Sequence, residues 1–246
     1  MSLQFSDTTS SKAGLIQECE ALIFGDNGYG RISGDTNLLA TFTRYLNEGL
    51  NRVASLIMSS DGRWQFDDNN QTDYPIGTTN LVNAQKDYQF SVNYLKITRV
   101  EVQDAAGSWH LLTPMDQADI YDQSLTDFLK TSGLPKYYDK MANSIFLYPS
   151  PATASVTTTN GLKVWFQRPP SYFITSDTTK VPGFNSMFHR LVALIASRDY
   201  AITKQLSNAK SLAELVTQQE DSLAETYTLR NKDEHIKLSV KQGSFN

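Results

Sequence analysis

Adjacent acidic residues near position 67 are the first candidates for chemistry in this sequence. Asp67 and Asp68 follow an aromatic stretch at residues 64–66, which could hold a sugar beside two carboxylates. Glycoside hydrolysis needs two carboxyl groups across a cleft, and neighbours at a strand end do not supply that separation alone. Asn69 and Asn70 follow, and they are typical of a turn. The pattern therefore favours a turn over a catalytic pair.

A second acidic group has a regular spacing of three residues. Asp116, Asp119 and Asp122 would share one face of a helix, and Pro114 just before them favours a helix start. A calcium loop needs ligands two residues apart and a glycine bend, which this segment lacks. Acidic residues in a first turn are favoured by the helix dipole, so the spacing predicts a solvated helix start.

The glycine-rich segment 25–34 resembles a nucleotide-binding loop only superficially. Gly28 and Gly30 are followed by Ser33 where a dinucleotide fingerprint needs a third glycine, and the segment follows a predicted helix rather than a strand. The sequence has no Gly-Lys-Ser/Thr motif for phosphate binding. We expect a flexible loop between two helices.

The histidines and the cysteine form no recognisable site. His110, His189 and His235 lie in unrelated contexts without metal-ligand spacing, and Cys19 lies within a predicted helix without an activating neighbour. There is also no Gly-x-Ser-x-Gly motif. The sequence therefore predicts no catalytic residue, no metal site and no cofactor, and a protein that is not an enzyme.

Arg198 and Asp199 are the most informative charged residues. They lie where the apolar stripe of Leu191, Leu194, Ile195 and Ile202 should continue. Charges in such positions are almost always paired. Two interpretations remain open: residues at the margin of the stripe, or an ion pair within a helical bundle or across a subunit boundary.

Helices are predicted at both ends of the sequence. The first part has a short helix at 13–24 and a strong one that starts behind the N-cap candidates Asp35 and Thr36 and ends near Ser60. The last part has a stripe formed by Phe184, Met187, Phe188, Leu191, Leu194, Ile195 and Ile202. A thinner stripe follows at about 208–231, formed by Leu212, Leu215, Val216, Leu223 and Tyr227.

The middle of the sequence predicts β structure, because Thr, Val and aromatic residues alternate with turn formers. The apolar alternations of 95–97 and 100–102 are out of phase by one residue, which predicts a bulge. Residues 104–107 should turn into a strand at 108–112, and 144–148 and 162–167 should form two more strands. Residues 153–160 read as a polar loop.

These elements predict an α+β fold. Neither helical end has enough apolar surface alone, so residues 11–60 and 184–232 should pack into one helical bundle. Residues 61–183 should form a β-rich, sandwich- or barrel-like insertion, and 233–246 an extended C-terminal tail.

Composition bounds the class of protein. The formal net charge of −4 argues against a protein that grips nucleic acid through its phosphates. A single cysteine cannot make an internal disulfide, which suits a reducing cytoplasm. The start of the chain lacks the pattern of a signal peptide, and no apolar run approaches the roughly 20 residues of a membrane span. We expect a protein that does not enter a membrane.

Several segments together resemble head-to-tail adaptor proteins of tailed bacteriophages, also called neck, connector or head-completion proteins. The similarity spans about residues 60–205, and the matching motifs are packing and turn motifs. They are 95–102, 133–139 (GLPKYYD), 144–149 (SIFLYP), 162–170 (LKVWFQRPP), 182–184, 188–194 and 198–201.

The resemblance implies a structural virion protein of the neck between head and tail, assembled in the host cytoplasm. It implies a homo-oligomeric ring, a dodecamer, that docks under the portal protein and receives downstream tail or neck proteins. Double-stranded DNA would pass through the lumen without specific binding. The sizeable β-rich insertion departs from adaptors that are mainly helical. The alternative is a carbohydrate- or receptor-binding β-sandwich module of a phage tail, which exposed aromatic residues in the insertion would favour.

The C-terminal tail is a candidate docking segment. Ile236, Leu238 and Val240 alternate with polar residues, so an extended segment would have one apolar face. No predicted strand precedes it closely enough to form a hairpin, and a lone strand needs an external edge or groove. We expect this tail to dock onto the portal, against the alternative of a frayed terminus.

Overall fold

The chain divides into two compact units, one helical and one built of strands. A computed structural model describes residues 2–60, 68–115 and 130–230. The helical unit comprises Met1–Asn70 and Pro170–Asn246, and the β unit comprises Gln71–Pro169. The predicted α+β class is confirmed by this mixture of helices and sheets.

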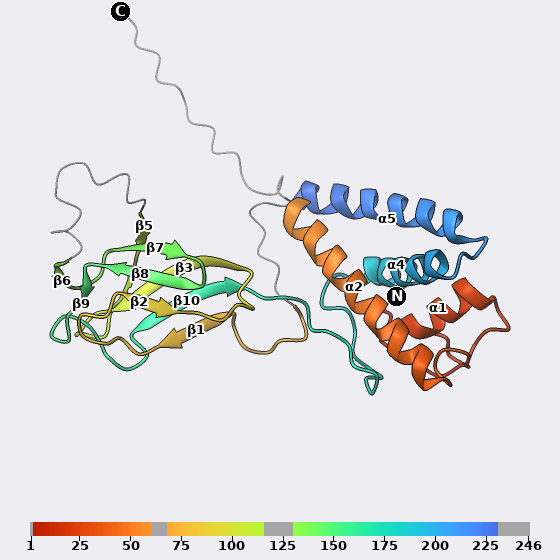
Figure 1. The fold of residues 1–246 in the computed structure, drawn as a ribbon, viewed down its shortest axis with the longest axis horizontal. Helices are drawn as coiled ribbons and strands as arrows, with labels where there is room; N and C mark the ends of the chain where they lie inside the picture. The colour runs from red at the N-terminus through yellow and green to blue at the C-terminus, as the bar shows by residue number, and fades with distance from the viewer. Residues whose placement is uncertain (1, 61–67, 116–129, 231–246) are drawn as a thin grey trace, which may run out of the picture. The chain divides into compact units, whose positions relative to one another are not determined.

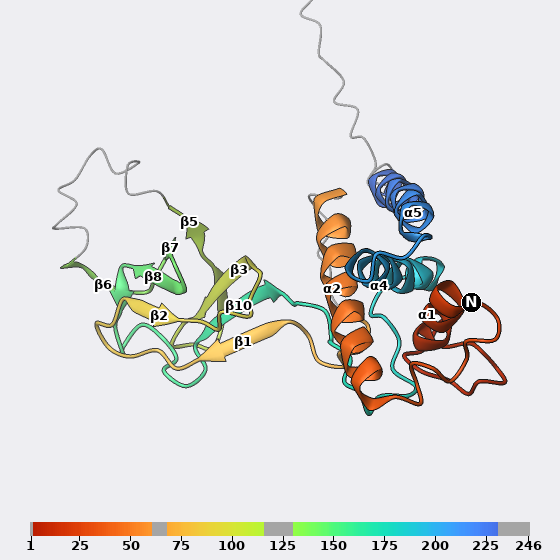
Figure 2. The same ribbon diagram turned by 45° about the vertical axis from the view of Figure 1, so that its right-hand side comes forward.

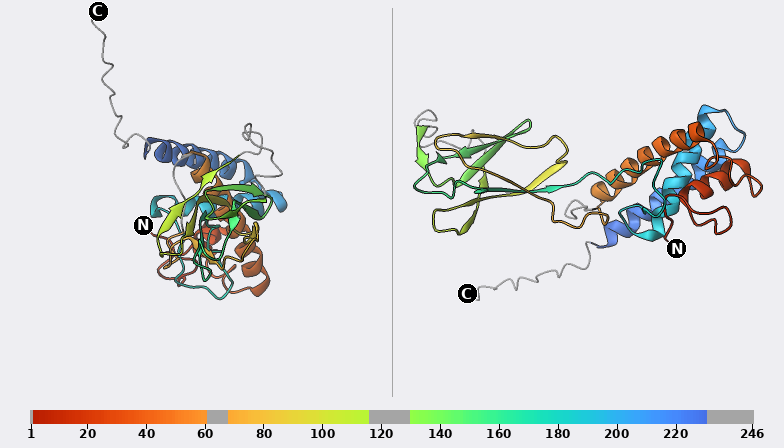
Figure 3. Two further views of the ribbon diagram at one scale, coloured as in Figure 1. Left: turned by 90° about the vertical axis from the view of Figure 1, so that its left-hand side faces the viewer. Right: turned by 90° about the horizontal axis from the view of Figure 1, so that it is seen from below.

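The helical unit is built around one central helix (Figure 1). Helix α4 (His189–Thr203) contacts α1 (Leu15–Phe24), α2 (Thr36–Ser60) and α5 (Ala209–Arg230). Figure 3 (right) shows α2, in orange, alongside the blue helices of the same unit. Asp35 caps α2, because its Oδ1 accepts hydrogen bonds from the N–H groups of Asn37 at 2.8 Å and Leu38 at 3.0 Å. The predicted N-cap is confirmed.

Helix α4 does not have the one-sided stripe that its sequence predicts. Residues 191–197 are all buried, because α4 has a neighbouring helix on several sides. Met187 and Ile202, predicted on the stripe, are 62% and 57% exposed. Met187 lies outside α4, in a short 3-10 helix (Ser186–Phe188) that the side chain of Asn185 caps. Ile202 lies in the last turn of α4, just before the chain turns toward α5.

Helix α5 packs through a single narrow stripe. Leu212, Val216, Leu223 and Tyr227 are buried in the helical core. Leu215, which the sequence predicts on this stripe, is 42% exposed. Its position lies about 60° from the nearest edge of the buried stripe at 100° per residue, so it faces away from α2 and α4. Most of the surface of α5 is therefore free of contacts within the unit.

The β unit contains two four-stranded sheets and a short two-stranded pair (Figures 1 and 2). Val100, Val102 and Val164 from one sheet and Ile145 and Leu147 from the other share one apolar core. The first sheet has the order β1 (Ile76–Thr79), β10 (Leu162–Gln167), β3 (Lys96–Gln103), β4 (Trp109–Leu111). The second has the order β2 (Asp87–Gln89), β8 (Ser144–Tyr148), β7 (Tyr137–Met141), β5 (Thr113–Pro114), and β6 (Ser132–Gly133) pairs with β9 (Ser150–Pro151).

The predicted bulge and hairpin are both present. Along β3 and β10, Arg99 pairs with Trp165 but Ile97 pairs with Phe166, so Thr98 is the extra residue. The bulge lets both Ile97 and Val100 reach the core. Strands β3 and β4 form the expected hairpin, and the strands predicted at 144–148 and 162–167 have the predicted bounds.

Candidate functional site

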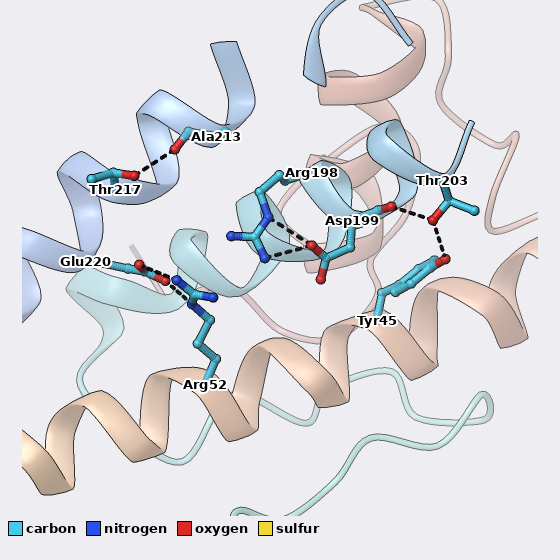
Figure 4. Close-up of polar contacts among 8 residues, drawn as sticks. All are labelled: Tyr45, Arg52, Arg198, Asp199, Thr203, Ala213, Thr217 and Glu220. Carbon is cyan, nitrogen blue, oxygen red and sulfur yellow. Dashed lines mark hydrogen bonds and ion pairs between the residues drawn. The ribbon is translucent and has the colours of Figure 1, made fainter. Parts of the chain in front are cut away.

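A group of charged side chains lies where α2, α4 and α5 meet (Figure 4). We call Arg52, Arg198, Asp199 and Glu220 the four-charge cluster. Arg52 of α2 contacts Glu220 of α5 through two parallel hydrogen bonds, from Nε to Oε1 and from NH2 to Oε2, the second of 2.8 Å. The Glu220 side chain is only 13% exposed, whereas that of Arg52 is 49% exposed. This bidentate pair ties α5 to α2.

Arg198 and Asp199 pair with each other on α4. The Arg198 Nε and NH2 groups donate to Asp199 Oδ1 at 2.9 and 2.7 Å. Their side chains are 15% and 27% exposed, so the pair lies at the edge of the core rather than in free solvent. The contact joins neighbouring residues of one helix. Its contribution to a subunit boundary stays a prediction.

Electrostatics link the two pairs. The pKa of the Arg52 guanidinium is raised above its usual value, first by the hydrogen bonds to Glu220 and further by the negative charges of Glu220 and Asp199. Two cations and two anions therefore neutralise one another within one region. Such a cluster holds helices together.

A hydroxyl pair extends the same region. The Thr203 hydroxyl donates to the Asp199 carbonyl oxygen at 2.8 Å, so the Tyr45 hydroxyl is the donor in its 3.2 Å contact with Thr203 Oγ1. Tyr45 belongs to α2 and Thr203 to the end of α4. The contact thus fixes the last turn of α4 against α2.

Among the described residues, the histidines singled out in the sequence have separate structural contacts. His110 contacts Asp104 at 2.7 Å on the surface of the β unit. His189 is buried, accepts a hydrogen bond from Leu3 N–H and donates one to the Phe184 carbonyl oxygen. Asp67, Asp116, Asp119, Asp122, His235, Ile236, Leu238 and Val240 lie outside the described residues.

Three buried carboxylates were not foreseen as structural anchors. Glu20 is fully buried, and its oxygens accept hydrogen bonds from the N–H groups of Gly30, Ile32 and Ser33 and from the Ser33 hydroxyl, at 2.8–3.0 Å. The glycine-rich segment is the predicted loop between helices, and Glu20 holds its backbone. No spacing rule in the sequence marks this role, since a glutamate within a helix is ordinarily a surface residue.

Asp68 has a comparable role in the helical unit. It is 2% exposed and accepts hydrogen bonds from Asn70 N–H at 2.8 Å, Asn70 Nδ2 at 2.7 Å and Ser171 N–H at 2.5 Å. Gly183 packs directly against this carboxylate, and Asn69 N–H donates to the Gly183 carbonyl oxygen. Asn69 and Asn70 form the predicted turn, and Asp68 fastens the outgoing chain to the returning chain.

Glu101 is the buried carboxylate of the β unit. It accepts hydrogen bonds from Arg99 Nε at 2.6 Å and Trp165 Nε1 at 3.2 Å, and Lys163 Nζ lies 3.7 Å away. Burial alone would raise the pKa of Glu101, but these hydrogen bonds and positive charges lower it overall. Glu101 therefore stays ionised and fully engaged.

Two hollows lined by described residues hold few charged side chains. One of about 190 Å³ lies between β1 and β2 and is lined by apolar, aromatic and small neutral side chains, including Tyr88, Phe90 and Tyr94. Another, of about 620 Å³, lies along α2, where Arg44 and Glu48 are its charged side chains and pair with each other. Among the described residues there is no group of three or more metal-ligating side chains.

Two further observations concern reactivity and membranes. Cys19 is buried, and burial raises the pKa of its thiol to about 12, which leaves it protonated and unreactive. Within the described part of the chain, no helix is long and apolar enough to cross a membrane.

Comparison with known proteins identifies the family. A search of curated proteins finds no match. Residues 12–232 match the model of a protein family described as SU10 adaptor protein. The match covers nearly all of both units and agrees with the resemblance carried by the motifs between residues 95 and 201. The chain therefore belongs to the SU10 adaptor protein family and is a phage structural adaptor, a component of the virion.

Proposed function

We propose that this chain is one subunit of a dodecameric ring that docks beneath the portal, extends the DNA channel and receives downstream tail or neck proteins. The observation that carries the proposal is the family match over residues 12–232, which spans both units. The net charge of −4 supports a conduit role, because an acidic wall does not hold passing phosphates.

The two units suggest a division of labour. In this proposal the helical ends form one bundle that docks with the portal, and the β unit is an insertion available to other partners. The tail residues Ile236, Leu238 and Val240 add an extended segment that docks onto the portal. The helices carry the larger apolar core, which suits the part of a neck that must stay rigid.

The proposed role is not enzymatic. Its support is that the buried carboxylates Glu20, Asp68 and Glu101 all accept hydrogen bonds from within the chain, and that Arg52 and Arg198 are both paired. Groups that are paired in this way stabilise the folded structure. Turnover of a nucleotide, peptidoglycan or polysaccharide that is lost on changing Asp67 or Asp116 with the fold intact would contradict this.

Sedimentation tests the ring proposal directly. At micromolar concentration, the purified chain should sediment as a monomer. The helices that the structure describes have no long apolar seam on their exposed surface that would drive self-assembly. Added portal rings from the same phage should convert it into a portal-bound ring. A stable closed ring without portal contradicts the templated assembly, and a chain that ignores portals contradicts the docking.

Truncation after Asn231 tests the tail separately. The truncated chain should keep the melting temperature of the full chain, because none of the helical core residues that the structure describes lies beyond Tyr227. It should lose affinity for portal, and heads completed with it should leak DNA. Full affinity for portal after truncation would leave the tail without a docking role.

The alternative function is carbohydrate or receptor binding by the β unit. Exposed aromatic side chains favour it, among them Tyr74 at 78% and Trp109 at 37% exposure. However, Lys163 Nζ lies 3.6 Å from the Trp109 ring centroid, so one ring face is already covered. Saturable binding of the full chain to host-surface glycans, lost on changing Trp109 or Tyr74 to Ala, would support this alternative over the adaptor ring.

A further inference from the structure

One face of the first sheet in the β unit has an unusual mixture of side chains. Residues that pair directly across neighbouring strands of this sheet have their side chains on the same face of the sheet. Val100, Val102, Leu162 and Val164 lie on the face that packs into the core. The opposite side, which we call the outer sheet face, therefore carries the alternate residues. They include Arg99, Glu101, Trp109, Leu111, Lys163 and Trp165, and also Ile76, Thr78 and Gln103.

The outer sheet face combines positive charge with exposed apolar area. Glu101 is 6% exposed and lies beneath Arg99 and Lys163, so the two cations outnumber the one buried anion. The Arg99 side chain is 51% exposed. Trp109 and Leu111 of the edge strand β4 are 37% and 59% exposed. Aromatic and arginine side chains of this kind are enriched at protein interfaces.

Helix α5 of the helical unit has the complementary character. At 100° per residue, Glu214, Asp221 and Glu225 fall within about 40° of one another, on the side opposite the buried stripe. All three are exposed, and none forms an ion pair with another described residue. Leu215 and Leu229 lie beside this acidic ridge and are 42% and 46% exposed.

We propose that the acidic ridge and flanking leucines of α5 from one copy pack onto the outer sheet face of a second copy. The contact rests on the proposed ring and names the surfaces that join its subunits. Opposite charges meet, since Glu214, Asp221 and Glu225 face Arg99 and Lys163. Exposed apolar side chains meet as well, since Leu215 and Leu229 face Trp109 and Leu111.

The geometry suits a ring of identical subunits. A helix laid on a sheet is one of the stable layer arrangements of proteins. The two surfaces are different patches of the same chain, so the contact is heterologous. Repetition of a heterologous contact closes into a ring when a whole number of subunit rotations adds up to one full turn. The charge component should make subunit contacts weaken as salt is raised.

Cysteine cross-linking locates the contact. One variant carries Leu111→Cys, another Leu215→Cys, and a third carries both, while buried Cys19 with its protonated thiol does not compete. Oxidised on portal rings, a mixture of the two single variants should give mixed dimers, and the double variant a covalent ladder. Without portal, both products should be lost. The matched control replaces Leu111→Cys by Met141→Cys on β7, which is 39% exposed in the second sheet and should not cross-link.

Three results would overturn the inference. A ring that forms on portals without any cross-link places the contact elsewhere, and cross-linking equal to that of the Met141→Cys control shows that it is unspecific. A cross-link within one monomer shows that α5 covers the sheet of its own chain. If the unmodified chain forms no ring on portals, the proposed function fails and this contact fails with it. Sedimentation of the unmodified chain with portals distinguishes this case from a ring that is joined through other surfaces.

Charge reversal supplies an independent test. The triple variant Glu214→Lys, Asp221→Lys and Glu225→Lys changes exposed residues only, so its melting temperature should stay close to that of the original chain. It should lose ring formation on portals. A control that adds lysines at exposed positions of α2, Ala40→Lys with Ser55→Lys, should still form the ring. Ring formation by the triple variant equal to that of the original chain would exclude the acidic ridge from the interface.

Discussion

Replacing Glu20 by glutamine should destabilise the helical unit strongly although it exchanges one oxygen for an NH2 group. The amide oxygen of the new side chain could keep the contacts to Ile32 and Ser33, but its NH2 group would face the N–H of Gly30, so one donor would lie against another. Hydrogen bonds to a charged group contribute about 1.5–3 kcal/mol each. In the variant, the hydrogen bond from Gly30 is lost and the other three hydrogen bonds go to a neutral acceptor. Removal of a buried charge offsets part of the lost stability.

The net loss in the free energy of unfolding should be about 3 kcal/mol. For a chain of this size, that corresponds to a melting temperature lower by roughly 6–12 °C. Differential scanning calorimetry measures the shift for the transition of the helical unit. Hydrogen exchange should also show faster exchange at the amides of Gly30, Ile32 and Ser33, because their acceptor is weakened.

Glu18→Gln on the same helix is the matched control. Glu18 pairs with Arg190 at 2.7 Å, but its side chain is 24% exposed and that of Arg190 is 59% exposed. Exposed pairs contribute about 0–1 kcal/mol, so this variant should melt close to the original chain. If Glu20→Gln is no less stable than Glu18→Gln, the four hydrogen bonds do not hold the loop and the reasoning fails.

Three further changes test other parts of the helical unit. Arg198→Ala should lower the free energy of unfolding by about 2 kcal/mol, because its partly buried carboxylate partner loses two hydrogen bonds, and an unchanged denaturation midpoint would mean that the pair is only peripheral. Gly183→Ala places a Cβ against the Asp68 carboxylate, closer than van der Waals contact allows, and should lower the melting temperature well below that of Gly133→Ala, where the nearest atom is 3.7 Å away. Burial lowers the pKa of His189, so protons bind the unfolded chain more readily, and stability should fall as pH drops below about 6.5. Melting curves at pH values of about 7.5 and about 5.5, on either side of the ordinary histidine pKa, should show a smaller pH dependence for His189→Gln, and an equal dependence would assign the effect to other groups.

Periodicity was enough to predict α2 and the strands β8 and β10, but not the strands β1, β2 and β7. Apolar spacing indicated α2 with its Asp35 cap, and the phase slip between 95–97 and 100–102 indicated the bulge at Thr98. These features depend on residues that are close together in the sequence, so local sequence patterns predict them. Met187, Ile202 and Leu215 were misplaced, since burial of a helical residue depends on which sides have neighbouring helices.

The buried carboxylates could not be predicted for a related reason. Glu20 meets a loop ten or more residues later, Asp68 meets Ser171 and Glu101 meets Trp165, and each partner is a backbone N–H or a side chain from a distant segment. A carboxylate that is buried by long-range contacts looks in sequence like one on the surface. Arg198 and Asp199 were recognised because their partners are adjacent in sequence and their position conflicts with an apolar stripe.

The Asp68 contact has a consequence for the evolution of the chain. Because Asp68 binds Ser171, the chain leaves the helical unit and re-enters it at neighbouring points. The hydrogen bond between Asp68 and Ser171 therefore offsets the entropic cost of closing the loop that runs between them. This cost grows only slowly with the number of residues in the loop. A different domain, or a short linker, could replace residues 71–169 without disturbing the helices. Related proteins could thus exchange residues 71–169 to suit new partners, while the helical unit stayed under separate selection.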